Sequence, residues 1–578
     1  MRIRRHRGVV RALTAAVAVA AVAAVTRTDG QAQNQRKFPG RGPRDWSHNR
    51  VIASRFGPDL DRNIDRDWRT FVKHQHLDQA RALQQSPMLG FFDALQQFLG
   101  SKKPPKTTEG HLDWNLRTGG TGNVVGAPAK YSFDISASNC SDVIYFTVDQ
   151  AGGATTPNLI AITNAYASYP GNAAGTTPTV KWAIAMTAGT ATSAVPSLDG
   201  SVLYVLENRG TGVILHAINV NNITLNPGSY NFGLQTWLST HTLAAPTGLA
   251  TSEQLFEITF AGVTNNVSSP YLDYNNNQIF FGDSAGRIQH VVNTNLTSAA
   301  RDTTNFTNAC GANQLQSPVY IFNQVIATSY NGRLYRLDTT GASPYACVAS
   351  AQGGAGTGAG IAGALSAPVV DVTNSQIIVS TNNASGFGVS GIGTFDLMFT
   401  AGAAQSSGQM IGNAVTTAPV SPNFDDAFFS TNNGNLYAVG SRVSGTDTYL
   451  LRLPYNGAVG APAGYAQLHR SGLAAVVAAS PVTEFLTASS LANKDFVFVG
   501  GGGGTYLFMN RIRAGFAGTD AAPVTMDNWF AVSTGIISPI TVDTRTANIT
   551  GGTATANIYF GTMGGGSQST IVQLAQQF

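Results

Sequence analysis

One repeated unit constrains the fold of this chain more than any other feature. It consists of a Ser-Pro or Ala-Pro step, a short apolar strand, a polar turn, a β-rich strand, a Gly or Asn turn and another alternating strand. Eight copies recur, roughly 45 to 75 residues apart, which brackets the length of a four-stranded propeller blade. The β-rich strands are predicted at residues 143–146, 202–205, 278–282, 325–328, 377–380, 427–430, 496–499 and 558–561.

The repeat predicts an all-β β-propeller of four-stranded blades over residues 116–578, with its first strand near Lys130. One such sheet cannot bury both of its faces, whereas blades stacked around an axis bury them against each other. The prolines fall where strands begin, and a missing N–H does least harm there. Asn-Gly at 331–332 and at 433–434 predicts hairpins, because both central residues of a type I′ turn need φ above zero.

The way the ring closes can also be predicted. The chain ends directly after the third strand of the last copy, so the last blade needs an outer strand from elsewhere. Residues 131–135 are expected to supply that strand and to close the ring. Eight blades are favoured on this interpretation. A seven-bladed ring with one additional hairpin is the alternative, because the first two copies match the unit least well.

Two copies resemble the quinoprotein-type propeller repeat, which is a PQQ-like repeat. The matching stretches are 332–341, which reads GRLYRLDTTG, and 434–439, which reads GNLYAV. This resemblance supports the fold. The sequence departs from the family at its chemistry, because the Asp-x-x-x-Gly step with a following Trp is mostly absent and no adjacent Cys-Cys pair occurs. The chain is similar in overall look to exported propeller proteins of environmental bacteria.

Residues 1–33 have the layout of a secretory signal peptide. Arg2, Arg4, Arg5 and Arg7 form a basic head, and an apolar run from Ala12 to Val25 follows. That run is shorter than the roughly 20 residues that a membrane-spanning helix needs. An uncleaved anchor is the alternative. We therefore expect a secreted, periplasmic or cell-surface protein with no transmembrane helix after signal removal.

Residues 34–115 form a basic segment with helical signals and a linker. Ile64, Trp68, Phe71 and Val72 lie at helical spacing within 59–76, and Ser86-Pro87 favours a second helix over 88–99. A short helical cap on the propeller, anchored by Trp46 and Trp114, is the favoured interpretation. The alternative is an arm that binds an acidic partner.

Charge is divided unevenly along the chain. Residues 33–130 carry 16 Lys and Arg against 9 Asp and Glu, whereas residues 131–578 carry 13 against 21. The propeller region has no basic stripe, and this argues against nucleic acid as a partner. We expect a monomer that meets a protein or a polysaccharide at the cell surface.

The three cysteines are Cys140, Cys310 and Cys347, and none has the spacing of a metal site. In an oxidising compartment Cys310 and Cys347 can form a disulfide between the two flanks of one repeat. Cys140 then serves as a small buried apolar residue. The sequence alone does not fix the pairing.

No residue earns a catalytic or metal-binding assignment. Asp273, Asn275 and Asn277 resemble the start of a calcium loop, but Gln278 and Ser284 stand where such a loop needs Gly and Glu. A polar turn between strands is favoured there, and also at residues 425–426. The glycine run 500–504 is predicted to be a hairpin tip, because it lacks the Lys and Ser or Thr of a phosphate loop.

Four histidines lie in the repeat region: His216, His241, His290 and His469. None has a paired-ligand spacing, and His216 and His290 fall near the ends of predicted third strands. Both are therefore expected to be hydrogen-bonded structural residues. No G-x-S-x-G occurs, and its absence removes the usual signal for a serine hydrolase.

Two functions remain after these exclusions. The favoured one is an exported, non-catalytic scaffold that binds through its loops and uses no cofactor. The alternative is a propeller enzyme with its site in the central funnel, either a quinoprotein-like oxidoreductase or a polysaccharide lyase or hydrolase. Quinone and calcium are the cofactors to consider in that case. Polar side chains that converge on the axis would favour the enzyme.

Overall fold

The computed structural model describes residues 42–44, 50–52 and 111–577, the last with gaps. The gaps are 133–141, 154–155, 166–177, 191, 222, 224–232, 235–253, 264–265, 267, 275, 293–299, 302–309, 311–312, 341–346, 350–362, 385–388, 404, 414–418, 442–447, 469–478, 487–494, 502–506, 533–535, 546–554 and 564–568.

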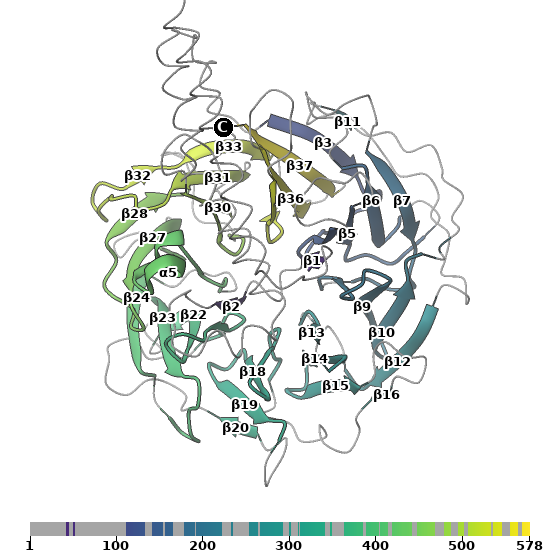
Figure 1. Ribbon diagram of the computed structural model, residues 1–578, viewed down its shortest axis with the longest axis horizontal. Helices are drawn as coiled ribbons and strands as arrows, with labels where there is room; N and C mark the ends of the chain where they lie inside the picture. Colours follow the sequence, from purple (N-terminus) through teal and green to yellow (C-terminus); the bar gives the residue numbers. More distant parts are fainter. Residues whose placement is uncertain are drawn as a thin grey trace, which may run out of the picture.

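The described strands form eight sheets arranged as the blades of one ring (Figure 1). Blade 1 contains β4 (Ala129–Ser132), β5 (Val143–Thr147), β6 (Leu159–Thr163) and β7 (Thr179–Ile184). Blade 2 contains β8 (Val195–Pro196), β9 (Val202–Arg209), β10 (Gly212–Asn219) and β12 (Gln254–Ala261). Blade 3 contains β13 (Tyr271–Asp273), β14 (Gln278–Gly282), β15 (Ile288–Val292) and β16 (Ala300–Arg301). Blade 4 contains β17 (Val319–Ile321), β18 (Gln324–Thr328), β19 (Leu334–Asp338) and β20 (Cys347–Ala349).

The second half of the ring follows the same order. Blade 5 contains β21 (Val369–Asp371), β22 (Gln376–Ala384), β23 (Val389–Asp396) and β24 (Ser407–Asn413). Blade 6 contains β25 (Asn423–Phe424), β26 (Gly434–Ser441), β27 (Thr448–Tyr455) and β28 (Gly464–Gln467). Blade 7 contains β29 (Thr483–Leu486), β30 (Asp495–Gly501), β31 (Leu507–Arg513) and β33 (Asp527–Val532). Blade 8 contains β34 (Ile536–Ile537), β35 (Thr541–Arg545), β36 (Thr555–Met563), β37 (Thr570–Gln577) and β3 (His111–Arg117).

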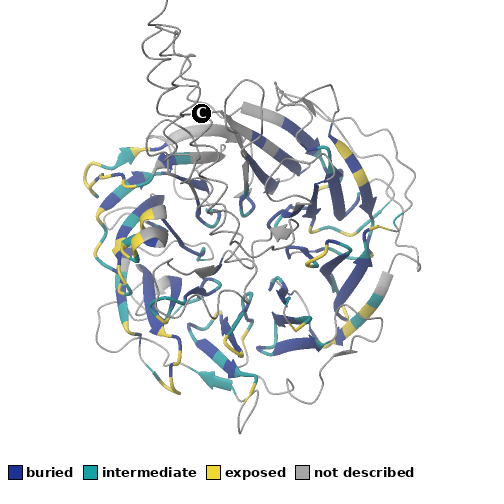
Figure 2. Ribbon diagram, in the orientation of Figure 1, coloured by how far each residue is buried: buried dark blue, intermediate teal, exposed yellow. Residues whose placement is uncertain are grey.

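The predicted eight-bladed, all-β propeller is confirmed, and the seven-bladed alternative is wrong. Buried residues line the strands of every blade (Figure 2). The hydrophobic cores form between blades rather than within them. One cluster, for example, joins Leu215 of blade 2 to Leu272 and Phe281 of blade 3. We call the face with the turns between first and second strands the first-turn face, and the face with the turns between second and third strands the second-turn face.

Strand β3 closes the ring, so the prediction that residues 131–135 do so is wrong. β3 pairs antiparallel with β37, and Trp114 lies opposite Gln573. Tyr131 instead belongs to β4, the inner strand of blade 1. Two strands, β3 and β4, precede the second strand of the first repeat. The prediction failed because it assigned ring closure to the region of β4, the nearer of the two. The expected domain boundary at residue 116 falls inside β3.

Trp114 is part of this closure and is fully buried. Its indole Nε1 donates to the carbonyl of Ala165 in blade 1 over 3.0 Å, and its ring lies 6.5 Å from that of Tyr559 in blade 8. One side chain therefore joins the first and last blades. Strand β11 (Gly233–Leu234), from the long connection of blade 2, pairs with the outer edge of β3. Trp46, the other expected anchor, lies outside the described residues.

Blade 6 departs from the predicted repeat. Residues 427–430 were expected to form a strand, but the chain forms helix α5 (Asp426–Thr431) there. Asp425 caps the helix by accepting from the backbone N–H of Phe428, and Asn432 ends it in a left-handed conformation with φ of 58°. The predicted hairpin at 433–434 is therefore wrong, because Gly434 begins strand β26. The hairpin of this blade joins β26 to β27 instead.

Serines close to the Pro step of the repeat link neighbouring blades. Backbone N–H groups of one blade donate to serine hydroxyls of the next: Ala127 to Ser193 at 2.8 Å, Ser193 to Ser269 at 3.0 Å, and Ser269 to Ser317 at 2.8 Å. At the closing seam, the hydroxyl of Thr541 in blade 8 donates to the carbonyl of Pro128 over 2.6 Å. These bonds tie neighbouring blades together close to the axis.

Two short N-terminal strands lie at the centre of the ring (Figure 1). β1 (Gly42–Arg44) pairs antiparallel with β4 of blade 1, and β2 (Val51–Ile52) pairs in parallel with β21 of blade 5. Blades 1 and 5 are opposite each other in a ring of eight. Arg50 is buried and donates to the carbonyls of Ser317 and, over 3.0 Å, of Pro318 in blade 4. The N-terminal segment therefore bonds to three blades within the channel.

Two further features concern the environment of the chain. Cys310 and Cys347 form a disulfide with a Cα–Cα separation of 5.4 Å. It joins the connection after blade 3 to β20, the outer strand of blade 4. Cys140 lies outside the described residues. Among the described residues, none of the helices has the length and apolar character to cross a membrane.

Candidate functional site

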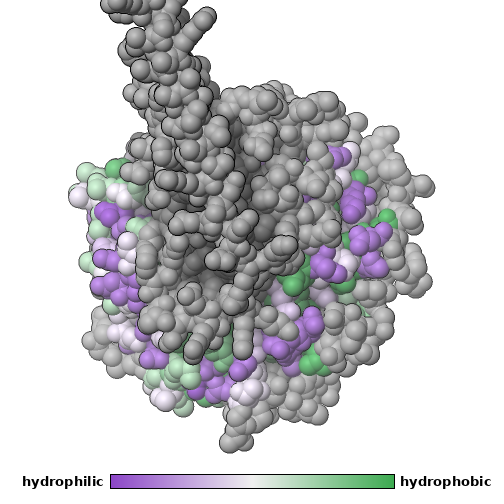
Figure 3. All heavy atoms as spheres, in the orientation of Figure 1, coloured by the Kyte–Doolittle hydropathy of each residue, from purple (hydrophilic) through white to green (hydrophobic). Residues whose placement is uncertain are grey.

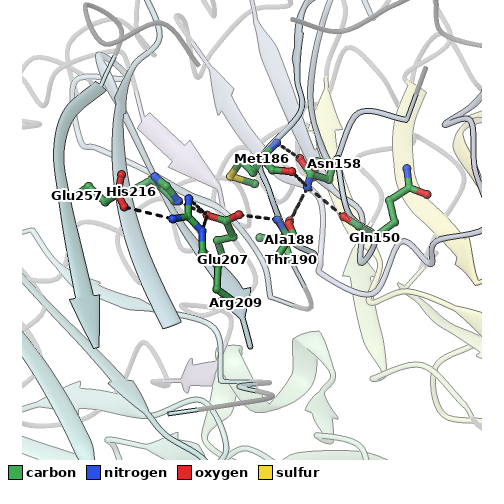
Figure 4. Close-up of polar contacts among 9 residues, drawn as sticks. All are labelled: Gln150, Asn158, Met186, Ala188, Thr190, Glu207, Arg209, His216 and Glu257. Atoms are coloured by element: carbon green, nitrogen blue, oxygen red, sulfur yellow. Dashed lines mark hydrogen bonds and ion pairs between the residues drawn. The ribbon is translucent and has the colours of Figure 1, made fainter. Parts of the chain in front are cut away.

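A group of charged side chains surrounds the buried Glu207 in blade 2 (Figure 4). Strands β9 and β10 form a tight hairpin in which Arg209 pairs with Gly212 and Glu207 with Ile214. Because side chains alternate across a strand, Glu207 and Arg209 share a sheet face with His216. Glu257 of β12 stands opposite His216 and joins the same group.

Glu207 is the centre of this group, and its side chain is fully buried. Its carboxylate accepts from the Nε2 of His216 at 2.8 Å, the guanidinium of Arg209 at 2.9 Å and the backbone N–H of Ala188 at 2.6 Å. The guanidinium of Arg209 also lies 3.8 Å from Glu257, and both of these side chains are about one-third exposed. The buried carboxylate is thus satisfied by three donors.

The electrostatics of Glu207 follow from these contacts. Burial acts to raise its pKa, but the hydrogen bonds from His216, Arg209 and Ala188 outweigh burial and hold the pKa below its ordinary value. The carboxylate is therefore ionised at neutral pH. An ionised acceptor at Nε2 assigns a proton to that nitrogen of His216.

The site extends into blade 1 through the connection between the two blades. Asn158 donates from its amide nitrogen to the carbonyls of Gln150, Met186 and Ala188 over 2.7–3.0 Å. Its amide oxygen accepts from the backbone N–H of Met186 at 2.7 Å. The connection is therefore held by Asn158 of blade 1 on one side and Glu207 of blade 2 on the other (Figure 4).

Packing leaves no room beside this connection. A Cβ at Gly152 would overlap the carbonyl of Met186, and a Cβ at Gly189 would overlap the carboxylate of Asp149. The backbone N–H of Asn208 donates to the carbonyl of Gly189 over 2.9 Å. The arrangement positions a loop rigidly and uses the polar atoms of Glu207 and Asn158 to do so. These contacts hold blades 1 and 2 together at their connection.

The two described histidines of the repeat region, His216 and His290, lie in different blades. His216 bonds to Glu207, and His290 of blade 3 bonds to the side-chain oxygen of Gln278 at 2.7 Å while its ring stacks on Phe280. The predicted hydrogen bonding is confirmed for these two histidines. His241 and His469 lie outside the described residues. The prediction singled out His216 but missed Glu207 and Arg209.

The suspected calcium loop forms the turn between β13 and β14, as predicted. Asp273 is buried and accepts from the amide of Asn276 over 2.7 Å, and Asn277 has φ of 53°. Asn275 lies outside the described residues. Asp425 lies, as predicted, in the connection between the first and second strands of its blade, β25 and β26, but this connection contains helix α5, which Asp425 caps. No group of three or more potential metal-ligating side chains is found among the described residues.

Gly500 and Gly501 are the last two residues of β30 and pair with Met509 and Phe508 of β31, so the predicted hairpin tip at 500–504 is wrong for these two residues. The remaining glycines of that run, 502–504, lie outside the described residues. A Cβ at Gly500 would come within 2.6 Å of Ile537 in blade 8, so this glycine allows close packing of two blades.

Comparison with known proteins finds similarity in fold only. No protein-family model and no curated protein matches the sequence. BamB from Moraxella catarrhalis aligns with a TM-score of 0.36 and 10% identity, over 76% of this chain and 92% of its own. Sqt1 from Saccharomyces cerevisiae aligns with a TM-score of 0.43 and 8% identity, over 81% and 99%. The computationally designed Ika8 protein aligns with a TM-score of 0.42 and 8% identity, over 81% and 100%.

Proposed function

We propose that this chain is an exported, non-catalytic propeller that binds a protein or polysaccharide at the cell surface and acts as a monomer. The observation that carries the proposal is the occupation of the central channel by the chain itself. β1 and β2 pair with the inner strands of opposite blades. Arg50, which directly precedes β2, is buried. A propeller enzyme of the quinoprotein type needs that central space for its cofactor.

The buried charges support the same conclusion. The carboxylate of Glu207 and the amide of Asn158 are engaged in positioning a backbone loop. Lys130 and Asp142 form a second pair, with both side chains fully buried and 3.1 Å between Nζ and Oδ2. These contacts stiffen the junctions between and within blades, as a scaffold requires. On the face shown in Figure 3, the visible described residues alternate between hydrophilic and hydrophobic around the rim.

Cofactor analysis of the purified, signal-free protein tests the non-catalytic half of the proposal. Quinone would be sought by absorbance and extraction, and metals by elemental analysis. We expect neither at a stoichiometric level. One equivalent of a quinone would overturn the proposal and favour an oxidoreductase.

Co-sedimentation tests the binding half. The protein would be mixed with insoluble peptidoglycan and with insoluble polysaccharides, and cross-linked on intact cells to capture surface proteins. We expect saturable binding to one of these classes, with bovine serum albumin as the unbound control. Failure to saturate any of them, together with turnover of a polysaccharide, would replace the scaffold with an enzyme.

A further inference from the structure

The strand registers show on which face the N-terminal segment lies. β2 runs parallel to β21, so the chain leaves Ile52 beside Asp371, at the end of β21 that leads into the first turn of blade 5. β3 runs antiparallel to β37 and begins with His111 opposite Ala575, near the end of the third strand of blade 8. Both points belong to the first-turn face. Residues 53–110 therefore leave and re-enter the described fold on the same face.

Apolar side chains are exposed on that same face. Among the described residues, the exposed large hydrophobic side chains are Leu198, Phe322, Tyr330 and Met398. Three of the four lie on the first-turn face, Leu198 and Phe322 in first turns and Met398 in the connection after β23. Tyr330 alone lies in a second turn. The asymmetry coincides with the face from which residues 53–110 depart.

Phe322 and Met398 lie on this face in neighbouring blades, 4 and 5. The amide nitrogen of Gln324, two residues after Phe322, donates to the sulfur of Met398 over 3.0 Å. This contact joins the first turn of blade 4 to the third-strand end of blade 5. Phe322 is 44% exposed and Met398 58% exposed. We call these two side chains the blade 4–5 patch.

The backbone at Phe322 shows that the fold alone does not select this residue. Phe322 and Asn323 have φ of 49° and 59°, and they form a two-residue turn between Ile321 and Gln324. Asn and Gly are the residues that this turn accepts at least cost, whereas a bulky side chain with positive φ is strained. An exposed aromatic ring held in a strained turn indicates a contact outside the described fold.

We propose that residues 53–110 pack on the first-turn face, with the blade 4–5 patch as their apolar docking site. The segment is 58 residues long and carries the predicted helix at 59–76, whose stripe of Ile64, Trp68 and Phe71 is apolar. An amphipathic helix needs an apolar surface to cover its stripe. β2, the last described strand before the segment, pairs with blade 5, and blade 5 also supplies Met398 to the patch.

Hydrogen exchange on the intact, signal-free chain tests the proposal. We expect backbone amides of residues 59–76 to exchange at least about tenfold more slowly than an unstructured peptide in the unmodified protein. In the double variant Phe322→Asn with Met398→Gln this protection falls about tenfold. Asn suits the turn, so the thermal midpoint of the propeller should not fall. The matched control, Tyr330→Asn on the opposite face, leaves the protection unchanged.

Several outcomes would overturn the proposal. Exchange of residues 59–76 at the rate of an unstructured peptide in the unmodified protein would do so, as would protection that the double variant leaves intact. Protection that disappears on dilution would assign the patch to a second copy of the chain. Protection that develops only after a partner protein is added would assign it to that partner.

Discussion

Single side chains hold the junction of blades 1 and 2, and Glu207 shows how. Its carboxylate satisfies three donors from two strands and one loop. Removal of a partner from a buried charge network leaves the other charges uncompensated, and this is costly. The junction therefore depends on the charge of one residue.

Glu207→Gln should lower stability in a pH-dependent way. At pH 7 the loss should be about 1.5–3 kcal/mol, because hydrogen bonds to a charged group become neutral ones. A carboxyl with a lowered folded pKa contributes stability above its unfolded pKa, and that contribution disappears as pH falls through the folded pKa. The difference between variant and unmodified protein should therefore shrink below pH 4.5, the ordinary value. Urea unfolding at pH 7 and pH 3 measures this difference in the free energy of unfolding. The control is Glu257→Gln, because the side chain of Glu257 is partly exposed.

Gly561→Ala tests the closing seam. A Cβ at this residue would overlap the side chain of Val124, in the connection from β3 of blade 8 to β4 of blade 1. Overpacking of this kind costs about 1–3 kcal/mol. Gly210→Ala is the matched control, because nothing lies within 4 Å of a Cβ there. Equal thermal midpoints for the two variants would contradict this expectation, because they would show that the seam accommodates the added methyl group without cost.

At the level of elements, the Ser-Pro steps of blades 7 and 8 each supply a hydroxyl to the second strand of their own blade. Ser538 accepts from the backbone N–H of Gly561 at 2.8 Å and donates to the carbonyl of Pro539 at 3.0 Å. Ser480 makes the same two contacts with Gly500 and Pro481 at 2.7 and 3.1 Å. The sequence signature of the repeat is thus a hydrogen-bonding device.

Ser538→Ala should destabilise blade 8. The buried N–H of Gly561 would lose its acceptor, at a cost of about 1–3 kcal/mol. Ser201→Ala, whose hydroxyl meets only the partly exposed turn carboxylate of Asp199, should change stability by less than about 0.5 kcal/mol. Chemical unfolding measures the stability of both variants. Equal losses of unfolding free energy would contradict the role of the Ser538 hydroxyl as acceptor for Gly561.

The elements also show where sequence reasoning succeeded. The repeat predicted eight blades because alternating strands and Pro steps are local signals. It failed at α5, where a short apolar run fits a strand or a helix, and the caps Asp425 and Asn432 were the signal that could have decided it. Glu207 could also have been found, since the two-residue loop at 210–211 fixes the hairpin register and places it near His216.

At the scale of the whole molecule, closure was the part that local signals could not predict. The choice between residues 131–135 and His111–Arg117 depends on pairing with a strand more than 400 residues away. No local propensity distinguishes the two candidates. The same holds for the strands in the channel, which add to inner strands of blades 1 and 5.

Truncation should separate the two N-terminal contributions. A chain that begins at Ser101 keeps β3 but loses β1, β2 and the bonds of Arg50, and we expect a modest fall in thermal midpoint. A chain that begins at Thr118 also loses β3, which exposes the edge of β37 and removes Trp114 from its site. That chain should unfold without a sharp transition in calorimetry. Equal transitions for the two chains would show that β3 does not close the ring.

The pairing of β3 with β37 also sets the order in which the molecule is made. A chain that is synthesised from its N-terminus presents β3 hundreds of residues before its partner strand. Contacts of such long sequence separation form late and slowly. Until then β3 and the growing row of blades present unpaired edges, which can join other chains. Correct assembly of the ring therefore depends on the last part of the chain to be synthesised, because β37, the partner of β3, lies there.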